Sequence, residues 1–188
     1  MDTSYINNYT IKLKSALNSL ATLEAIPLLA EAMKKTWVNG NSIFICGNGG
    51  SAGNAVHMAN DFLYGAGVKN GKGLRVEALS ANTAVITCLG NDLGYDQIYS
   101  EQVKVKGNPG DILIVLSGSG NSSNVVKAIE VANSIKMKTF AILGYDGGKC
   151  KDLADVSIHF DINDMQIAED LQLIVGHMCM QWLCEQKL

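Results

Sequence analysis

Hydrophobic residues along this chain follow two different spacings. From residue 4 to about residue 38 they recur every three or four positions, which is typical of amphipathic helices. We predict two helices there, with a break near Pro27, because proline is well tolerated in the first turn of a helix. Farther along, short continuous apolar runs replace this pattern, and such runs are typical of strands buried on both faces of a parallel sheet.

The alternation of these patterns predicts the class of fold. Apolar runs predict strands over residues 42–46, 74–79, 111–116, 139–143 and 156–160. Helical patterns cover residues 51–64, the stretch up to about residue 106, residues 123–135, and the chain from about residue 164 onward. Strands that alternate with helices indicate an α/β fold, a doubly wound three-layer sandwich with a five-stranded parallel sheet. We divide this single domain into N-terminal helices (1–40), a parallel α/β core (41–163) and a C-terminal helix (164–188).

The C-terminal helix is apolar around most of its circumference. Its apolar residues are Ile167, Leu171, Leu173, Ile174, Val175, Met178, Met180, Trp182 and Leu183. A helix with this pattern has to be buried nearly all round. Because a small domain has little surface with which to cover its own terminal helix, we expect another subunit to pack there, in a homo-oligomer.

Composition narrows the class of protein and of partner. The 188 residues fit one domain, and a net charge of −3 without a run of Lys or Arg argues against nucleic acid as the main partner. No apolar run approaches the roughly 20 residues that span a bilayer, and the first residues lack the pattern of a signal peptide. The five cysteines include no CxxC pair, as expected for reduced thiols. We therefore expect a soluble cytoplasmic protein with no membrane partner.

Two loops rich in glycine and serine follow predicted strands and enter predicted helices. They are Gly-Asn-Gly-Gly-Ser at residues 47–51 and Ser-Gly-Ser-Gly-Asn-Ser-Ser at residues 117–123. Open α/β sheets bind ligands at such loops, where the N–H groups and dipole of a helix N-terminus favour an anion. The nucleotide-binding patterns GxxxxGK[ST] and GxGxxG are absent, which favours a small phosphate ester. The alternative is that these residues only form turns and helix caps.

The loops supply several groups that could hold a phosphate. The hydroxyls of Ser51, Ser117, Ser119 and Ser122 can donate hydrogen bonds. Glycines between them allow the backbone N–H groups to approach a ligand closely. Two such loops in one short chain favour the phosphate hypothesis over the alternative of simple turns.

A second set of residues suits a divalent metal ion. His57 and Asp61 are four positions apart and share one face of a predicted helix, while Glu169 and His177 lie on the last helix. Imidazoles and carboxylates together are typical ligands of zinc. Glu169 and His177, however, are separated by about 12 Å along a straight helix. They could share an ion only through long side chains, a distorted helix or different subunits, and the alternative is two interior histidines with a solvated Asp61.

These residues together resemble a known family. The loop at residues 47–51, the spaced His57, Gly90-Asn91-Asp92 and Ser119-Gly120-Asn121-Ser122 resemble the sugar isomerase (SIS) domain and, more narrowly, the phosphoheptose isomerases. The resemblance runs in order over essentially the whole chain. It implies a flavodoxin-like five-stranded sheet between helices, assembled as a homotetramer with active sites between subunits. The implied activity is isomerisation of sedoheptulose 7-phosphate in bacterial heptose biosynthesis, for lipopolysaccharide or capsule.

The resemblance also implies roles for individual residues. The metal ligands, for zinc, fall on His57, Asp61, Glu169 and His177, and the proton-transfer pair is Asp61 with His177. Substrate-binding positions fall on Asn48, Gly49, Gly50, Ser51, Asp92, Ser117, Gly118, Ser119, Ser122 and Glu169. The chemistry requires no redox or nucleotide cofactor. The third histidine, His159, is expected to be structural.

Three departures from the family pattern leave alternatives open. The family usually has Glu at the position of Asp61 and Gln at the position of Glu169, so Glu169 is an alternative for the catalytic base. An arginine common in the family is replaced by the segment 65–67, with Lys69 and Lys72 as possible substitutes. Two alternatives to a phosphoheptose isomerase stay open. One is an isomerase of another phosphosugar, and the other is a non-catalytic SIS adaptor of the kind that associates with a replication initiator. Retention of both histidines favours the enzyme.

Overall fold

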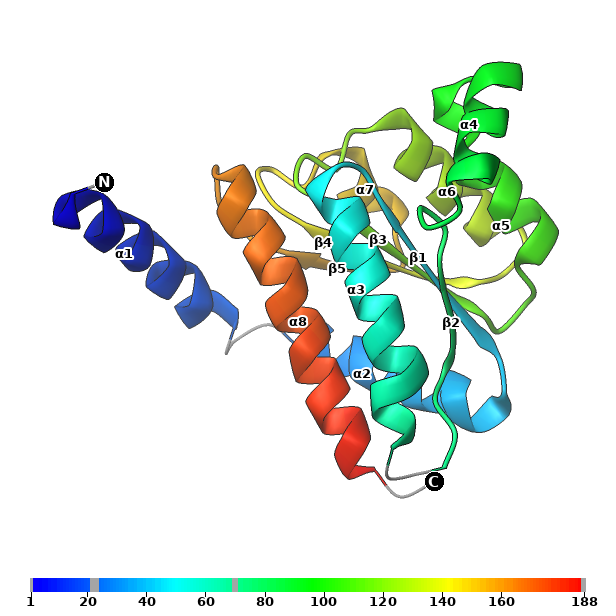
Figure 1. Cartoon of the computed structure of the whole chain (residues 1–188), viewed down its shortest axis with the longest axis horizontal. Coiled ribbons are helices and arrows are strands. Elements are labelled where there is room, and N and C mark those ends of the chain that lie inside the picture. Colours follow the sequence, from blue (N-terminus) through cyan, green and yellow to red (C-terminus); the bar gives the residue numbers. More distant parts are fainter. Residues whose placement is uncertain (1, 21–23, 69–70, 187–188) are drawn as a thin grey trace.

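The five predicted strands form one parallel sheet. The computed structural model describes residues 2–20, 24–68 and 71–186 (Figure 1). Its strands are β1 (Ser42–Gly47), β2 (Arg75–Ala78), β3 (Ile112–Ser117), β4 (Lys138–Leu143) and β5 (Val156–His159). They lie in the order β2-β1-β3-β4-β5, with every neighbouring pair parallel. This is the order of flavodoxin-like folds, so the predicted fold class is confirmed.

Alternating strand residues build two hydrophobic cores, one on each face of the sheet. Ile43 and Ile45 pack toward α2 (Ala25–Asn39), α3 (Gly50–Tyr64) and α8 (Met165–Glu185). Phe44 and Cys46, one position out of phase, pack toward α5 (Ser100–Lys106), α6 (Ser123–Ser134) and α7 (Gly148–Leu153). Successive side chains of a strand point to opposite faces. The continuous apolar runs therefore fill both cores and produce the three layers.

The strand order places the two glycine-serine loops side by side. From β1 the chain passes through α3 to β2 on one side, and β3 lies on the other side of β1. Because both connections leave the carboxyl ends of adjacent parallel strands, the β1–α3 and β3–α6 loops meet at the same edge of the sheet. This edge is the strand-switch point at which open α/β folds bind ligands.

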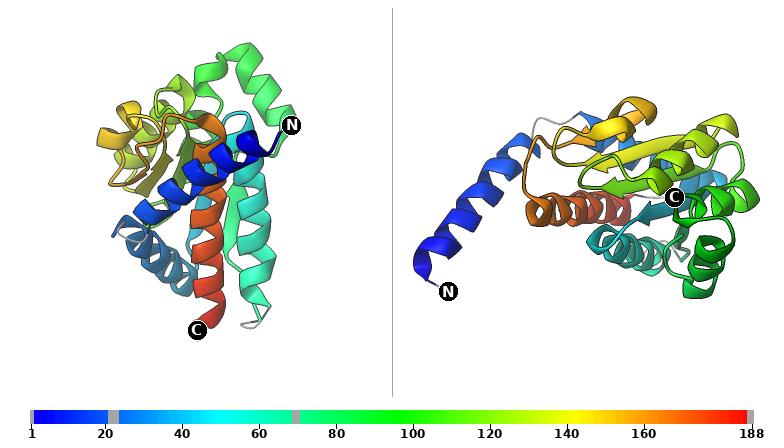
Figure 2. Two further views of the ribbon diagram at one scale, coloured as in Figure 1. Left: turned by 90° about the vertical axis from the view of Figure 1, so that its left-hand side faces the viewer. Right: turned by 90° about the horizontal axis from the view of Figure 1, so that it is seen from above.

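The first helix projects from the body of the protein. α1 (Thr3–Leu20) stands apart from the layers in Figure 1 and in the view from above (Figure 2, right). Tyr9 Oη donates to Asp170 Oδ2 at 2.5 Å, and Lys12 Nζ lies 3.0 Å from Asp164 Oδ2. These contacts attach α1 to the beginning of α8. The next helix begins at Ala25, which places Pro27 in its first turn as predicted.

Two parts of the helix prediction differ from the structure. The stretch before residue 106 contains three elements, α4 (Thr83–Asp92), the 3-10 turn η2 (Tyr95–Gln97) and α5, because Gly94 at φ +105° ends the first of them. The short helix α7 was not predicted, since its sequence consists of turn-like glycines and a brief polar segment. A further 3-10 turn, η1 (Gly65–Gly67), follows α3. Among the described residues, no helix is long and apolar enough to cross a membrane.

The last helix is covered on only one face by its own chain. Leu171, Val175 and Leu183 are fully buried against α2, α3 and the sheet. Trp182 remains partly exposed, and Met178 is 44% exposed. A single chain therefore does not provide the nearly complete burial that the apolar pattern predicts.

Candidate functional site

Close packing fixes the backbone of the β1–α3 loop. A Cβ atom on Gly47 would lie 2.7 Å from the carbonyl oxygen of Leu116 on the neighbouring strand, so this position accepts only glycine. The buried Tyr99 hydroxyl donates a hydrogen bond to the Gly47 carbonyl oxygen. The exposed Gly49 and Gly50 then begin α3. The first turn of α3 thus presents its N–H groups at the edge of the sheet.

The β3–α6 loop is shaped by Ser117 and Gly120. Ser117 Oγ accepts the Gly120 N–H at 3.0 Å, and both residues are buried. Gly120 has φ +64°, and an added Cβ would lie 2.0 Å from the carbonyl oxygen of Gly147. Ser119 and Ser122 are partly exposed, and the Ser122 side chain does not cap α6. The structure thus assigns Ser117 to shaping the loop and leaves two hydroxyls at the surface for a ligand.

Open space adjoins the second loop. Ser119 lines a cavity of about 460 Å³ together with Asn121, Tyr145 and Asp161. Ser119 Oγ accepts the Asn121 N–H at 3.3 Å, which turns this hydroxyl toward the loop backbone. Gly118 is buried beneath the loop against Met165. The surface beside this loop is therefore open, and it carries the carboxylates of Asp146 and Asp161 as well as the Ser119 hydroxyl.

Buried amide side chains hold the loops and helices around this edge. Asn48 and Asn124 exchange two hydrogen bonds across the switch point, at 2.9 and 2.8 Å. Gln172 on α8 donates to Ser51 Oγ at 3.1 Å and accepts from Asn54 at 3.0 Å. Ser51 is buried in this contact, so its hydroxyl packs between helices instead of lying open to a ligand. Neither Asn124 nor Gln172 was predicted, although a polar residue at a core position of a helix was a usable signal.

Three predicted metal ligands meet where α3 and α8 run side by side. His57 Nε2 lies 2.9 Å from His177 Nε2, and Asp61 Oδ2 lies 3.4 Å from the first nitrogen and 3.6 Å from the second. Among the described residues, this is the group of His, Cys, Asp and Glu ligand atoms that could hold a metal ion. Ligands at about 2.0–2.1 Å from a tetrahedral zinc ion stand about 3.3 Å apart, so the observed separations fit such an ion.

Glu169, the fourth predicted ligand, does not join this cluster. Its carboxylate lies against Gly50, where an added Cβ would be 2.3 Å from Oε2. The anionic group therefore sits at the N-terminus of α3, where the helix dipole favours negative charge. Two turns of α8 separate it from His177, about 12 Å along the axis. Within one chain Glu169 lies apart from the cluster, so its role as a metal ligand stays a prediction that depends on residues from different subunits.

Other predicted residues lie in varied surroundings. Asp92, at the exposed end of α4, accepts from Asn91 Nδ2 at 2.7 Å, and its hydrogen bond with Cys88 raises the pKa of that thiol. Lys72 lies at the opposite edge of the sheet, where its carbonyl oxygen accepts from Trp37 Nε1 at 3.1 Å. It therefore cannot replace the family's arginine at the loops of its own chain. Lys69 lies outside the described residues.

The remaining histidine and the buried thiols are structural. His159 Nε2 donates to the Tyr145 carbonyl oxygen at 2.8 Å, which ties β5 to the loop after β4. Burial raises the pKa of Cys150 and of Cys179 to about 12, so both stay protonated and unreactive. All five cysteines are free thiols.

Comparisons with known proteins agree with the geometry. The SIS domain family matches residues 4–144. The chain is 37% identical over 182 residues to a phosphoheptose isomerase of Aliarcobacter butzleri, a match that covers 90% of this chain and 96% of that protein. It is 39% identical over 168 residues to a phosphoheptose isomerase of Helicobacter pylori, with 88% and 85% covered. A solved phosphoheptose isomerase from Francisella tularensis superposes with a TM-score of 0.92 at 28% identity, over 99% of this chain and 100% of that one.

Proposed function

Because the chain belongs to the phosphoheptose isomerases of the SIS domain family, we propose that it interconverts sedoheptulose 7-phosphate and D-glycero-D-manno-heptose 7-phosphate. This aldose–ketose isomerisation would supply heptose for bacterial lipopolysaccharide or capsule. The observation that carries the proposal is the convergence of His57, Asp61 and His177 beside the helix that begins at the glycine-serine loop.

The cluster offers groups for each proton transfer of the reaction. Asp61 takes the proton from C1 of the ketose, and the electron pair moves into the C1–C2 bond while the C2 oxygen gains a proton. His177 gives that proton to the C2 oxygen and takes one from the C1 hydroxyl at Nδ1, since its Nε2 faces the cluster, and Asp61 returns its own proton to C2. A carboxylate and an imidazole within 3.6 Å of each other are suited to these transfers.

A zinc ion fits the same three side chains. His57, Asp61 and His177 would hold it, as three protein ligands do in catalytic zinc sites. When bound, zinc polarises the carbonyl group and the neighbouring hydroxyl of the substrate. Asp61 Oδ2 faces the imidazoles, whereas Oδ1 lies 3.4 Å from Asn60 Nδ2 and is the oxygen left for proton transfer.

The phosphate is assigned to the second loop. Ser119 and Ser122 are the hydroxyls of the predicted set that remain partly exposed there, at the N-terminus of α6. Ser51 and Ser117 act behind them by shaping the site. On the other loop, the Glu169 carboxylate already occupies the beginning of α3 and would repel a second anion.

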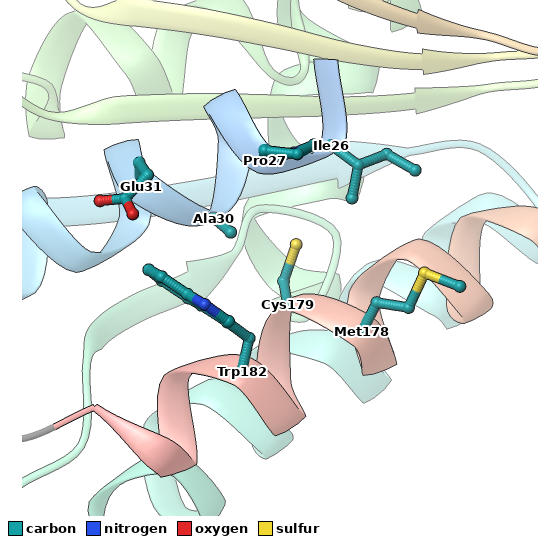
Figure 3. A pocket seen from close by; sticks show the side chains of 7 residues that line it. All are labelled: Ile26, Pro27, Ala30, Glu31, Met178, Cys179 and Trp182. Carbon is teal, nitrogen blue, oxygen red and sulfur yellow. The ribbon is translucent and has the colours of Figure 1, made fainter. Parts of the chain in front are cut away.

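We assign the chain to a homotetramer in the cytoplasm. A groove of about 290 Å³ runs between α2 and α8, lined by Ile26, Ala30, Met178 and Trp182 among others (Figure 3). The partly uncovered face of α8 continues it, and α1 projects with Ile11 exposed by 64%. A second copy of the chain is the occupant that would cover these surfaces. Five free thiols support a reducing compartment.

Product identification tests the proposed reaction. The purified chain is incubated with sedoheptulose 7-phosphate and with other ketose phosphates, with and without added zinc. We expect a heptose 7-phosphate aldose from the first substrate and little turnover of the others. Preferential turnover of another ketose phosphate would reassign the substrate, and no turnover of any would favour a binding protein.

A further inference from the structure

A reciprocal amide bridge joins the two loops at the switch point. Asn48 Nδ2, in the β1–α3 loop, donates to Asn124 Oδ1 at 2.9 Å, and Asn124 Nδ2 donates back to Asn48 Oδ1 at 2.8 Å. Asn124 lies in the first turn of α6 and is 1% exposed, whereas Ser122 and Ser123 of the same turn reach the surface. The Asn124 side chain therefore faces the other loop and cannot touch a ligand at the surface.

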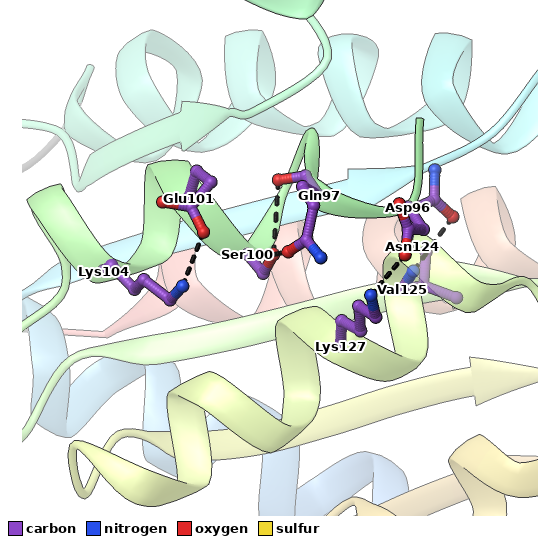
Figure 4. A network of polar contacts seen from close by, with 8 residues as sticks. All are labelled: Asp96, Gln97, Ser100, Glu101, Lys104, Asn124, Val125 and Lys127. Carbon is purple, nitrogen blue, oxygen red and sulfur yellow. Dashed lines mark hydrogen bonds and ion pairs between the residues drawn. The ribbon is translucent and has the colours of Figure 1, made fainter. Parts of the chain in front are cut away.

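Each amide oxygen of the bridge accepts a second hydrogen bond. Asn124 Oδ1 also accepts the backbone N–H of Val125 at 2.9 Å (Figure 4). Asn48 Oδ1 also accepts the hydroxyl of Tyr95, from the turn η2, at 3.0 Å. Removing one amide would leave a buried donor or acceptor on the other without a partner, which is costly. The two loops are thus held at one separation.

Further contacts attach the segment around the turn η2 to the β1–α3 loop and to α6. Asp96 forms an ion pair with Lys127 of α6 (Figure 4). That ammonium group lowers the pKa of the Asp96 carboxyl, so the pair stays charged near neutral pH. Tyr99, just after η2, donates to the carbonyl oxygen of Gly47. The segment from α4 to α5, which carries Asp92, is thereby joined to the β1–α3 loop and to α6.

We propose that Asn124 is a positioning residue, which aligns the β1–α3 loop with the phosphate-binding turn of α6 through Asn48. The inference rests on the proposed function, because it assumes that the substrate phosphate binds at this turn. Hydrogen-bond donors favour an anion most when they are fixed before it arrives. Through Tyr95 the same bridge fixes the end of α4 beside the site. Asn124 therefore acts on phosphate affinity without contacting the phosphate.

A matched control separates this role from simple support of the fold. Asn133 lies at the other end of the same helix, donates to the Leu153 carbonyl oxygen at 2.9 Å and accepts from Thr139 Oγ1 at 2.9 Å. Asn133→Ala removes two side-chain hydrogen bonds of the same helix, at an exposed position far from the loops. It should lower the melting temperature and leave phosphate binding unchanged.

The test measures the Kd of inorganic phosphate by calorimetry and the kinetics of the sugar phosphate. Asn124→Ala should weaken phosphate binding about tenfold, with a raised KM and a smaller change in kcat. Asn48→Ala should do the same, and the double variant should be no weaker than the weaker single variant, because both remove one bridge. Multiplying losses in the double variant, or an Asn124→Ala protein that binds phosphate as Asn133→Ala does, would overturn the proposal.

Two further measurements keep the test decisive. If Asn124→Ala does not fold, Tyr95→Phe replaces it, since it removes only one hydroxyl at the surface of the bridge. Its loss in phosphate affinity should be smaller and should disappear in an Asn48→Ala background, and a loss that persists there would contradict the bridge. Wild-type protein that binds phosphate but turns over no heptose phosphate would refute the proposed function and leave the bridge intact.

Discussion

The loop edge and the histidine cluster are built in opposite ways. At the loop edge, hydrogen bonds from buried side chains such as Asn124 and Gln172 hold the backbone before any ligand arrives. In the cluster, His57 and His177 expose about half of their side chains, and their nitrogens face each other at 2.9 Å. The first region is prepared to bind, whereas the second brings polar groups together that need an ion or a substrate between them.

This difference separates affinity from chemistry. Groups that hold the loops contribute to binding of the ground state, whereas the proton carriers of the cluster act on the transition state. Changes at the loop edge should therefore appear mainly in KM, and changes in the cluster mainly in kcat. The same chemical substitution can be made in each region, because Asp61 lies in the cluster and Glu169 at the loop edge.

The largest effect is expected from the carboxylate of the cluster. Asp61→Asn keeps the shape of the side chain but removes the base, so kcat should fall by about 10²- to 10⁴-fold. The matched variant Glu169→Gln changes a carboxylate that lies at Gly50, and it should keep measurable turnover with a lowered KM for the phosphate substrate. Steady-state kinetics of both variants decide whether Asp61 or Glu169 is the catalytic base. Loss of kcat in Glu169→Gln alone would show that the base is Glu169.

The second effect concerns the exposed serines of the β3–α6 loop. Each hydrogen bond to a charged phosphate contributes roughly 1.5–3 kcal/mol, so Ser119→Ala and Ser122→Ala should each weaken binding about tenfold to a hundredfold. Isothermal titration with the sugar phosphate and with its dephosphorylated form measures the loss. Equal losses for both ligands would show that the phosphate does not bind at this loop.

The third effect is stabilisation by zinc. A ligand at 100 times its Kd stabilises the folded state by about 2.7 kcal/mol, which corresponds to a rise in Tm of roughly 5–10 °C for a chain of this length. Thermal melts with zinc and with a chelator should show this rise in the wild type and in Glu169→Gln. His57→Gln should show little of it. A rise that survives in His57→Gln would place the ion elsewhere.

The smallest effect is expected at α1, away from both regions. The Lys12 ammonium lowers the pKa of Asp164 below 3.8, so the charged pair stabilises the attachment of α1 above that value. The contribution is lost as the pH falls through the lowered pKa, and for an exposed pair it is about 0.2–1 kcal/mol. Hydrogen exchange of the α1 amides from pH 6 to pH 3 measures it. Lys12→Met should remove the dependence of this exchange on pH. An exchange profile that is the same in the variant and the wild type would show that the ion pair does not stabilise the attachment of α1.

Some of these features could be predicted from the sequence, and others depend on packing. Apolar runs such as residues 111–116 predicted the strands, because buried parallel strands leave little choice of residue. The spacing of His57 and Asp61 predicted their shared face, and His177 joins them because α3 and α8 run side by side. The position of Glu169 depends on which turn of α8 faces Gly50, and no local pattern contains that information.

The predictions from the sequence missed mainly the interactions between segments that are far apart along the chain. Asn124 and Asn48 are 76 residues apart, and their pairing exists only because β1 and β3 are neighbours in the sheet. Ser51 was predicted to contact the ligand, but the structure buries its hydroxyl against Gln172, 121 residues away. A serine in a glycine-rich loop has the same local sequence in either role.

The assignment of isomerase chemistry to the cluster can be tested by hydrogen transfer. Sedoheptulose 7-phosphate is incubated in deuterium oxide with the wild type and with Asp61→Asn, and the aldose product and recovered ketose are analysed by NMR. We expect the wild type to place solvent deuterium at C2 of the aldose and at C1 of the ketose, and Asp61→Asn to abolish both signals. Exchange at wild-type rates in a folded, zinc-loaded Asp61→Asn protein would contradict the role of this cluster.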